Sequence, residues 1–146
     1  MKLSDRHLVE DEDADKLVLG PDFEEANGLL NDEVRIVLEA LVKSKRDEGR
    51  EVPPLLERSL AYATRLSVYQ NRPTLEAARE VVQRAGLTGF QAGTIGNLTP
   101  GSVEEAFALV PGLRLTFPDE TEEERETSHD ALQSILEGLE KYKKHT

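Results

Sequence analysis

Residues 31–45, with the sequence NDEVRIVLEALVKSK, determine how the rest of the chain must be organised. Their apolar side chains recur every three or four positions, which is the period of one face of an α-helix. The members of this face are Val34, Val37, Leu38 and Leu41. Asn31 or Asp32 can cap the helix at its N-terminus, and we expect the helix to run to about Lys45.

The same helix is apolar on more than one side, because Ile36, Ala40 and Val42 lie outside its main face. A helix of this kind is sandwiched between two layers of protein. The second layer can be the core of its own domain or a partner protein. The chain has only four Phe, three Tyr and no Trp, and its hydrophobic fraction is 38%. These low values favour a partner that supplies part of the burial.

A short apolar segment precedes the helix. Leu17, Val18 and Leu19 are followed at once by Gly20-Pro21, which ends regular structure. Three residues are too few for an autonomous strand, so an extended strand here needs a sheet edge supplied from elsewhere. The alternative is a coil that lies across its own domain.

Five more helices are predicted after residue 50, with almost no strand and no internal repeat, so the fold class is mainly α. Their expected starts are Pro53-Pro54, Pro73, the region after Leu87, the capping box of Ser102 and Glu105, and Thr127 or Ser128. Gly86 is a natural C-terminal cap. Gly93 and Gly96 each cost about 1 kcal/mol inside a helix relative to alanine, which indicates close backbone packing there.

Three of these helices carry apolar positions at helical spacing. The positions are Leu55, Tyr62, Leu66 and Tyr69 in the first, Leu75, Ala78 and Val82 in the second, and Leu132, Ile135, Leu136, Leu139 and Tyr142 in the last. Aliphatic side chains dominate these sets, so we expect an aliphatic core.

The net charge of −11 is concentrated in two segments. Residues 1–15 hold six acids and two bases, and residues 119–126 hold six acids and one base. We expect residues 1–15 to be a disordered tail and residues 114–127 to be an acidic loop. The alternative role for both acidic segments is an electrostatic tether to a basic partner. The acidic balance also argues against unaided binding to a nucleic-acid backbone.

No arrangement of residues typical of catalysis, a metal site or a cofactor site is found. The chain has no cysteine, and its histidines, His7, His129 and His145, have no second histidine at helical spacing. Asp11, Asp13 and Asp15 resemble the start of a calcium loop, but the sixth position is lysine rather than glycine. We therefore expect no enzymatic activity, no metal and no cofactor. No apolar run approaches the length of a membrane span.

Five segments in this order resemble the family of the fourth subunit of eukaryotic RNA polymerase II, which includes the related stalk protein of the archaeal polymerase. They are LVLGPDF at 17–23, LLNDEVRIVLE at 29–39, YATRLS at 62–67, the stretch from Phe90 to Leu113, and QSILEGL at 133–139. The resemblance covers residues 15–142. The family usually has Ala-Gln-Leu where this chain has Gly93-Thr94-Ile95, so we expect that helix to be short or irregular.

The resemblance implies a non-catalytic nuclear subunit that forms a heterodimer with the seventh subunit in the stalk of the polymerase. It also implies roles in transcription initiation and factor recruitment, and contact with nucleic acid only through the complex. The implied organisation is an acidic tail (1–15), a strand and helix that dock on the partner (16–48), and a helical domain similar to the HRDC fold (49–146).

The interface implied by the resemblance consists of apolar residues in the strand and the first helix. They are Leu17, Val18, Leu19, Phe23, Leu30, Val34, Val37, Leu38 and Leu41. Half of the helix residues can instead fill the protein's own core. Other functions remain open: the equivalent subunit of RNA polymerase III or of an archaeal polymerase, and a free-standing HRDC-like module. That module would bind nucleic acid through Arg58, Arg65, Arg72 and Arg79.

Overall fold

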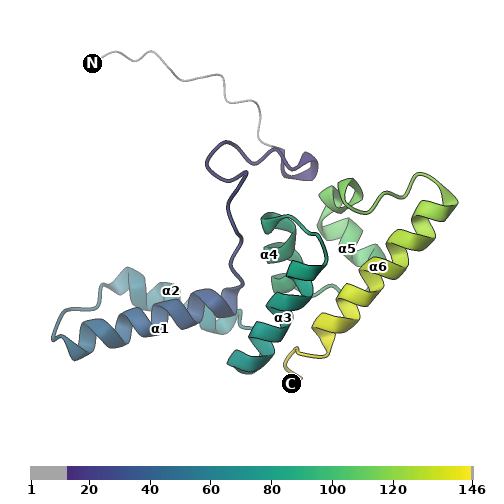
Figure 1. Ribbon diagram of the computed structural model, residues 1–146. Helices are drawn as coiled ribbons and strands as arrows, with labels where there is room; N and C mark the ends of the chain where they lie inside the picture. Colours follow the sequence, from purple (N-terminus) through teal and green to yellow (C-terminus); the bar gives the residue numbers. More distant parts are fainter. Residues whose placement is uncertain (1–12, 146) are drawn as a thin grey trace, which may run out of the picture.

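Six α-helices and two short 3₁₀ turns make up the regular structure of residues 13–145, the part of the chain that the computed structural model describes (Figure 1). The α-helices are α1 (Asn31–Asp47), α2 (Pro54–Arg65), α3 (Arg72–Arg84), α4 (Gly89–Leu98), α5 (Val103–Leu109) and α6 (Glu122–Glu140). The 3₁₀ turns are η1 (Ala14–Lys16) and η2 (Pro111–Leu115). The prediction of a mainly α fold is confirmed. No helix within residues 13–145 is both long and apolar enough to cross a membrane.

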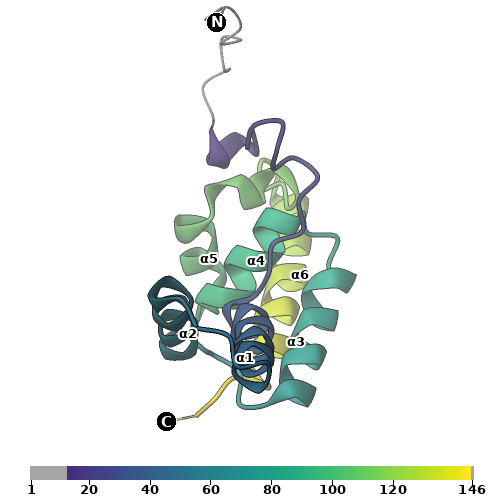
Figure 2. The ribbon, with the colours of Figure 1, turned by 90° about the vertical axis from the view of Figure 1, so that its left-hand side faces the viewer.

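The helices form a body and a projecting hairpin. The body contains α3, α4, α5 and α6, while α1 and α2 form an antiparallel pair that extends away from it (Figure 1). Figure 2 looks at the free end of this pair and shows α2 and α3 on opposite sides of α1. One side of α1 therefore packs on α2, and only its first turns reach the body.

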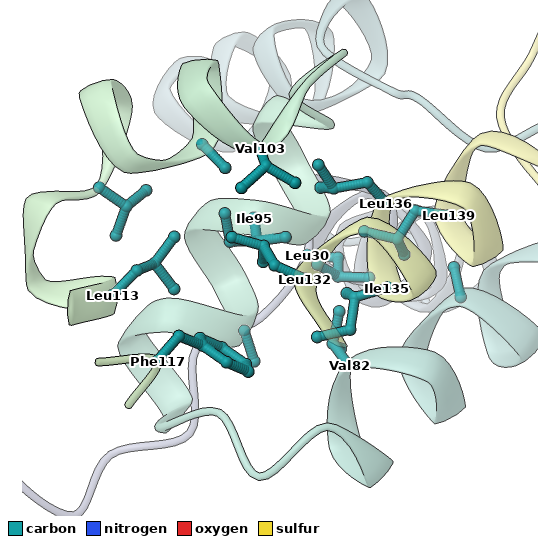
Figure 3. Packing of buried hydrophobic residues seen from close by; sticks show 14 of the residues in the cluster. Leu30, Val82, Ile95, Val103, Leu113, Phe117, Leu132, Ile135, Leu136 and Leu139 are labelled. Atoms are coloured by element: carbon teal, nitrogen blue, oxygen red, sulfur yellow. The ribbon is translucent and has the colours of Figure 1, made fainter. Parts of the chain in front are cut away.

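The core lies inside the body and is mainly aliphatic (Figure 3). Its larger members are Leu30, Val82, Ile95, Val103, Leu113, Phe117, Leu132, Ile135, Leu136 and Leu139. The apolar faces predicted for α3 and α6 are buried as expected, except that Tyr142 is only half-buried. Helical periodicity was a reliable guide to these two helices because each presents one face to a single core.

Glycines allow the chain before α1 to lie directly on α4. A Cβ added to Gly28 would lie 2.5 Å from the carbonyl oxygen of Gly89, and Gly93 faces the Cα of Gly28. A Cβ at Gly96 would collide with Leu30. The expectation of close backbone packing is therefore confirmed at Gly93, whereas the close neighbour of Gly96 is the Leu30 side chain. Of the two alternatives expected for this helix, irregularity is wrong, because α4 is helical over all ten of its residues; with ten residues it is shorter than α1, α2, α3 and α6.

The last helix begins earlier than predicted. It starts at Glu122 rather than at Thr127 or Ser128, so the acidic segment from Glu122 onward is helical and not a loop. Thr121 is the N-cap: its hydroxyl accepts from the Glu124 amide, and the Glu124 carboxylate accepts from the Thr121 amide at 3.0 Å. Acidic side chains in a first turn interact favourably with the helix dipole. Because an acidic run is also typical of a loop, the start of this helix was not recognised from the sequence.

The expected strand at residues 17–19 is absent from the described chain. Val18 instead pairs with Asp13 in an isolated bridge that closes a tight turn around η1, and Leu17 has a φ of 58°. The Asp13 carboxylate accepts from the Asp15 amide and pairs with Lys16, which lowers the pKa of Asp13. These local bonds satisfy the backbone without a second strand. Residues 13–15 of this turn belong to the tail 1–15 that was expected to be disordered, and they form part of an ordered turn. Residues 1–12 of the expected tail lie outside the described residues.

We predict that replacing Gly28 with alanine destabilises the protein by about 1–3 kcal/mol, because the new methyl group meets a backbone oxygen that cannot move aside. Chemical denaturation measures this free energy of unfolding. Gly101→Ala is the matched control, since its added Cβ meets only the flexible side chain of Glu105, at 3.3 Å. Equal effects of the two substitutions would contradict the close contact at Gly28.

Candidate protein-docking site

The hairpin of α1 and α2 is held together by a narrow apolar seam. Val42 of α1 and Ala63 of α2 are the buried residues between the two helices. Val34, Leu38, Leu56 and Leu60 are half-buried beside them. Since α2 is a single neighbour, it covers only one sector of α1.

A second set of large apolar side chains on the same hairpin has no cover within the described chain. Val37, Leu41, Leu55, Tyr62 and Leu66, which we call the hairpin face, are between 38 and 72% exposed. The α1 pair is spaced by four residues, and the α2 members, including its C-cap, are spaced by seven and four, so each group forms a row along its helix.

The two rows of the hairpin face lie on the same side of the hairpin. An α-helix turns by about 100° per residue. Around its own helix axis, each of Arg46 (α1) and Glu57 (α2) is displaced from the seam in the same rotational sense. Their charged groups lie 3.8 Å apart, so both residues are on one side of the hairpin. The hairpin-face residues of both helices are rotated in the opposite sense. Both rows therefore lie on the other side, and the hairpin has one polar and one apolar side.

The structure divides the nine predicted interface residues into five environments. Val37 and Leu41 belong to the hairpin face, whereas Val34 and Leu38 are half-buried near the seam. Leu17, Val18 and Leu19 are half-buried in the N-terminal turn, and Phe23 is exposed on the connection that follows it. Leu30 is 0% exposed in the core, so its predicted place in a surface is corrected. Its side chain fills the space left by Gly96.

Three residues of the hairpin face were missing from the predicted set: Leu55, Tyr62 and Leu66. Their spacing had identified a face of α2, but Tyr69 does not extend it, because α2 ends at Arg65 and Tyr69 is buried in the body. The signal that could have found them is a second apolar row beside them, formed by Leu56, Leu60 and Ala63. A single neighbouring helix cannot cover both rows.

The base of the hairpin is fixed by polar contacts. Leu30, and neither Asn31 nor Asp32, occupies the N-cap position of α1, and its amide donates to Glu33 Oε2 at 2.7 Å. The Asn31 amide donates to Asn97 Oδ1 at 2.7 Å. Arg79 of α3 binds both Glu33 and the carbonyl oxygen of Gly28. These bonds join the start of α1 to α3 and α4.

Within residues 13–145, no group of three or more His, Cys, Asp or Glu side chains is placed to hold a metal ion. His129 is half-exposed, with Nε2 3.8 Å from a Glu104 carboxylate oxygen. His7 and Asp11 lie outside the described residues. The prominent feature of the surface of residues 13–145 is therefore the apolar hairpin face. A face of this kind can bind another apolar surface.

The fold and this surface define a small helical protein with an exposed apolar face on a projecting hairpin. The family described as RNA polymerase Rpb4 matches residues 28–143. The chain therefore belongs to the RNA polymerase Rpb4 family, and the resemblance to the fourth subunit of RNA polymerase II is confirmed.

Three relatives illustrate this similarity. DNA-directed RNA polymerase II subunit 4 of Arabidopsis thaliana is 38% identical over 109 residues, which cover 72% of this chain and 79% of the relative. DNA-directed RNA polymerase II subunit rpb4 of Dictyostelium discoideum is 29% identical, with 94% and 92% covered. The subunit of the same name from Schizosaccharomyces pombe is also 29% identical, with 88% and 90% covered.

We predict that Leu30→Ala lowers the free energy of unfolding by about 2–5 kcal/mol, because it empties part of the core. Val37→Gln should change it by less than about 0.5 kcal/mol, since the side chain is already exposed in the free chain. Urea denaturation of the two variants measures both values. A large loss of stability in Val37→Gln would assign the hairpin face to this chain's own core.

Proposed function

We propose that this chain is a non-catalytic subunit of RNA polymerase II that docks through its hairpin face on the seventh subunit, as part of the polymerase stalk. The observation that carries the proposal is the uncovered apolar face on α1 and α2 in a chain of the Rpb4 family. As a stalk subunit it would be nuclear and would act in initiation and factor recruitment. It would meet nucleic acid only through the complex.

The composition of the hairpin face supports a protein partner. Burying one Val, Leu or Phe side chain contributes about 1.5–3 kcal/mol, so five large side chains can support a stable interface. Tyrosine is enriched among the residues that dominate binding energy, and Tyr62 lies within the α2 row. The Arg65 guanidinium lies 5.5 Å from the centre of the Tyr62 ring, so the face also has a cationic neighbour.

The N-terminal segment is the second part of the proposed interface. Local hydrogen bonds between its own residues hold the turn of residues 13–18, and Phe23 beyond it is exposed. Pairing of residues 17–19 with a sheet edge of the partner would replace the Asp13–Val18 bridge with intermolecular backbone hydrogen bonds. The proposed docking part then comprises residues 16–48 together with α2, so it takes α2 from the start of the expected HRDC-like domain 49–146.

The alternative of a free-standing nucleic-acid-binding module has weaker support. Two of its four arginines are neutralised within the chain: Arg72 binds Glu76 at 2.9 Å, and Arg79 binds Glu33. The whole chain also carries a net charge of −11. Binding to a phosphate backbone needs concentrated and available positive charge, which these pairs remove.

We predict that Val37→Asp combined with Leu41→Asp weakens binding to the seventh subunit about 100-fold or more. Each substitution would place a carboxylate in an apolar interface, and 1.4 kcal/mol corresponds to a factor of ten. Affinity measured by calorimetry with the purified partner gives the result. Leu109→Asp is the matched control, because Leu109 is also exposed but lies on α5, away from the hairpin (Figure 1).

Affinity purification of the chain from native cells, followed by mass spectrometry, tests the assembly itself. Recovery of RNA polymerase II subunits with the unmodified chain, and their loss with the double variant, is the expected result. Recovery of RNA polymerase III subunits, or equal recovery with the double variant, would contradict the proposal.

A further inference from the structure

A nearly buried carboxylate lies at the base of the hairpin. Asp32, in the first turn of α1, is 1% exposed. It accepts from the Ser67 hydroxyl, from the Val68 amide at 2.9 Å and from the Tyr69 amide at 3.4 Å. All three donors belong to the connection between α2 and α3. One side chain thus joins the entry of the hairpin to its exit.

The C-terminal segment holds the same connection from the other side. The Lys144 amide donates to the Val68 carbonyl at 2.8 Å, and Lys143 pairs with Tyr69 in an isolated bridge. Lys144 Nζ donates to the Ser67 carbonyl at 3.3 Å and to the Ser67 hydroxyl at 3.1 Å. The Ser67 hydroxyl is therefore shared between Asp32 and Lys144, which are far apart in the sequence.

Two further contacts complete the arrangement. The Tyr69 hydroxyl donates to the Gly96 carbonyl at 2.7 Å, and burial raises the pKa of Tyr69, so the phenol remains a donor. The guanidinium of Arg35, which is largely buried, lies 3.9 Å from the Asp32 carboxylate. A buried carboxylate with several donors and a nearby cation is satisfied only in one arrangement of these segments.

We propose that Asp32, the connection Ser67–Tyr69 and the C-terminal pair Lys143–Lys144 form a latch that fixes the direction of the hairpin relative to the body. Asp32 and Lys144 are then positioning residues for docking, although neither belongs to the hairpin face. The effect of the latch on docking rests on the proposed function, whereas the latch itself is a property of the free chain.

The physical reason is preorganisation. The chain around Leu30, with the Glu33–Arg79 and Asn31–Asn97 contacts, holds the entry of the hairpin on the body, and the latch holds its exit. Opening the latch releases the exit, so the hairpin can change direction about its entry. A partner that contacts both the hairpin face and the N-terminal segment requires one direction of the hairpin. Binding would then have to restrict this motion, and that restriction weakens affinity.

Two variants open the latch while the hairpin face stays intact. Asp32→Ala removes the shared acceptor, and deletion of residues 143–146 removes the C-terminal tie without touching Asp32. The deletion carries the test if Asp32→Ala does not fold. Asp47→Ala is the matched control, because this α1 carboxylate is exposed and pairs only with Lys43 among the ion pairs.

Distances between spin labels on α2 and α6 report the direction of the hairpin. The chain has no cysteine, so thiol-reactive spin labels attach only to cysteines that are introduced. Ala61→Cys on α2 and Ser134→Cys on α6 introduce them at exposed positions. We expect a narrow distance distribution in the unmodified chain and in the control. A broader distribution is expected in both latch variants, with affinity for the seventh subunit about ten-fold lower and cooperative unfolding of the body retained.

The outcomes separate this inference from the proposed function. An unchanged distance distribution in the latch variants would overturn the latch, whatever the binding result. A broader distribution with unchanged affinity would overturn the role of the latch in docking. Failure of the hairpin-face double variant to weaken binding would instead overturn the proposed function, and the distances would still decide whether the latch exists.

Discussion

The contact of Leu30 with the glycine-bearing surface of α4 connects the two parts of the molecule. Leu30 lies one residue before α1, yet it is fully buried in the core that α3 to α6 build. The contact is possible because Gly96 leaves room for its side chain and because Gly28 approaches Gly89 and Gly93 without a Cβ on either side. The start of α1 is thereby fixed on the body, and the rest of the hairpin extends from that point.

Electrostatic interactions follow from this geometry. The Glu33 carboxylate accepts from the amide of the N-cap residue Leu30 and also binds Arg79. One side chain therefore both satisfies the start of α1 and ties α1 to α3. The acidic residues 122–124 stabilise the start of α6 through the helix dipole. Part of the high acidic content therefore has a structural role. On the hairpin, the ion pair of Arg46 and Glu57 lies on the side opposite to the hairpin face.

Much of the fold was predicted from the helical periodicity of apolar residues, and the errors of that prediction have physical causes. The buried face of α3 was predicted correctly because its pattern is local and all its members face one core. The start of α6 was misplaced because Thr121 lies within an acidic run that is also typical of loops. The exposed row on α2 was not assigned to the site, since its spacing alone does not say which neighbour covers it. The role of Asp32 depends on partners 35 to 37 residues away, so no local pattern could predict it.

The position of Leu30 also bears on the order in which the chain can fold during synthesis. Its site is formed by α4, which is made more than fifty residues later, and the core is completed only by α6 at the other end of the sequence. The hairpin contacts are local and can form early, whereas long-range contacts must wait for the chain that makes them. An emerging chain thus carries a hairpin that can form early and becomes anchored only after α6 has been made.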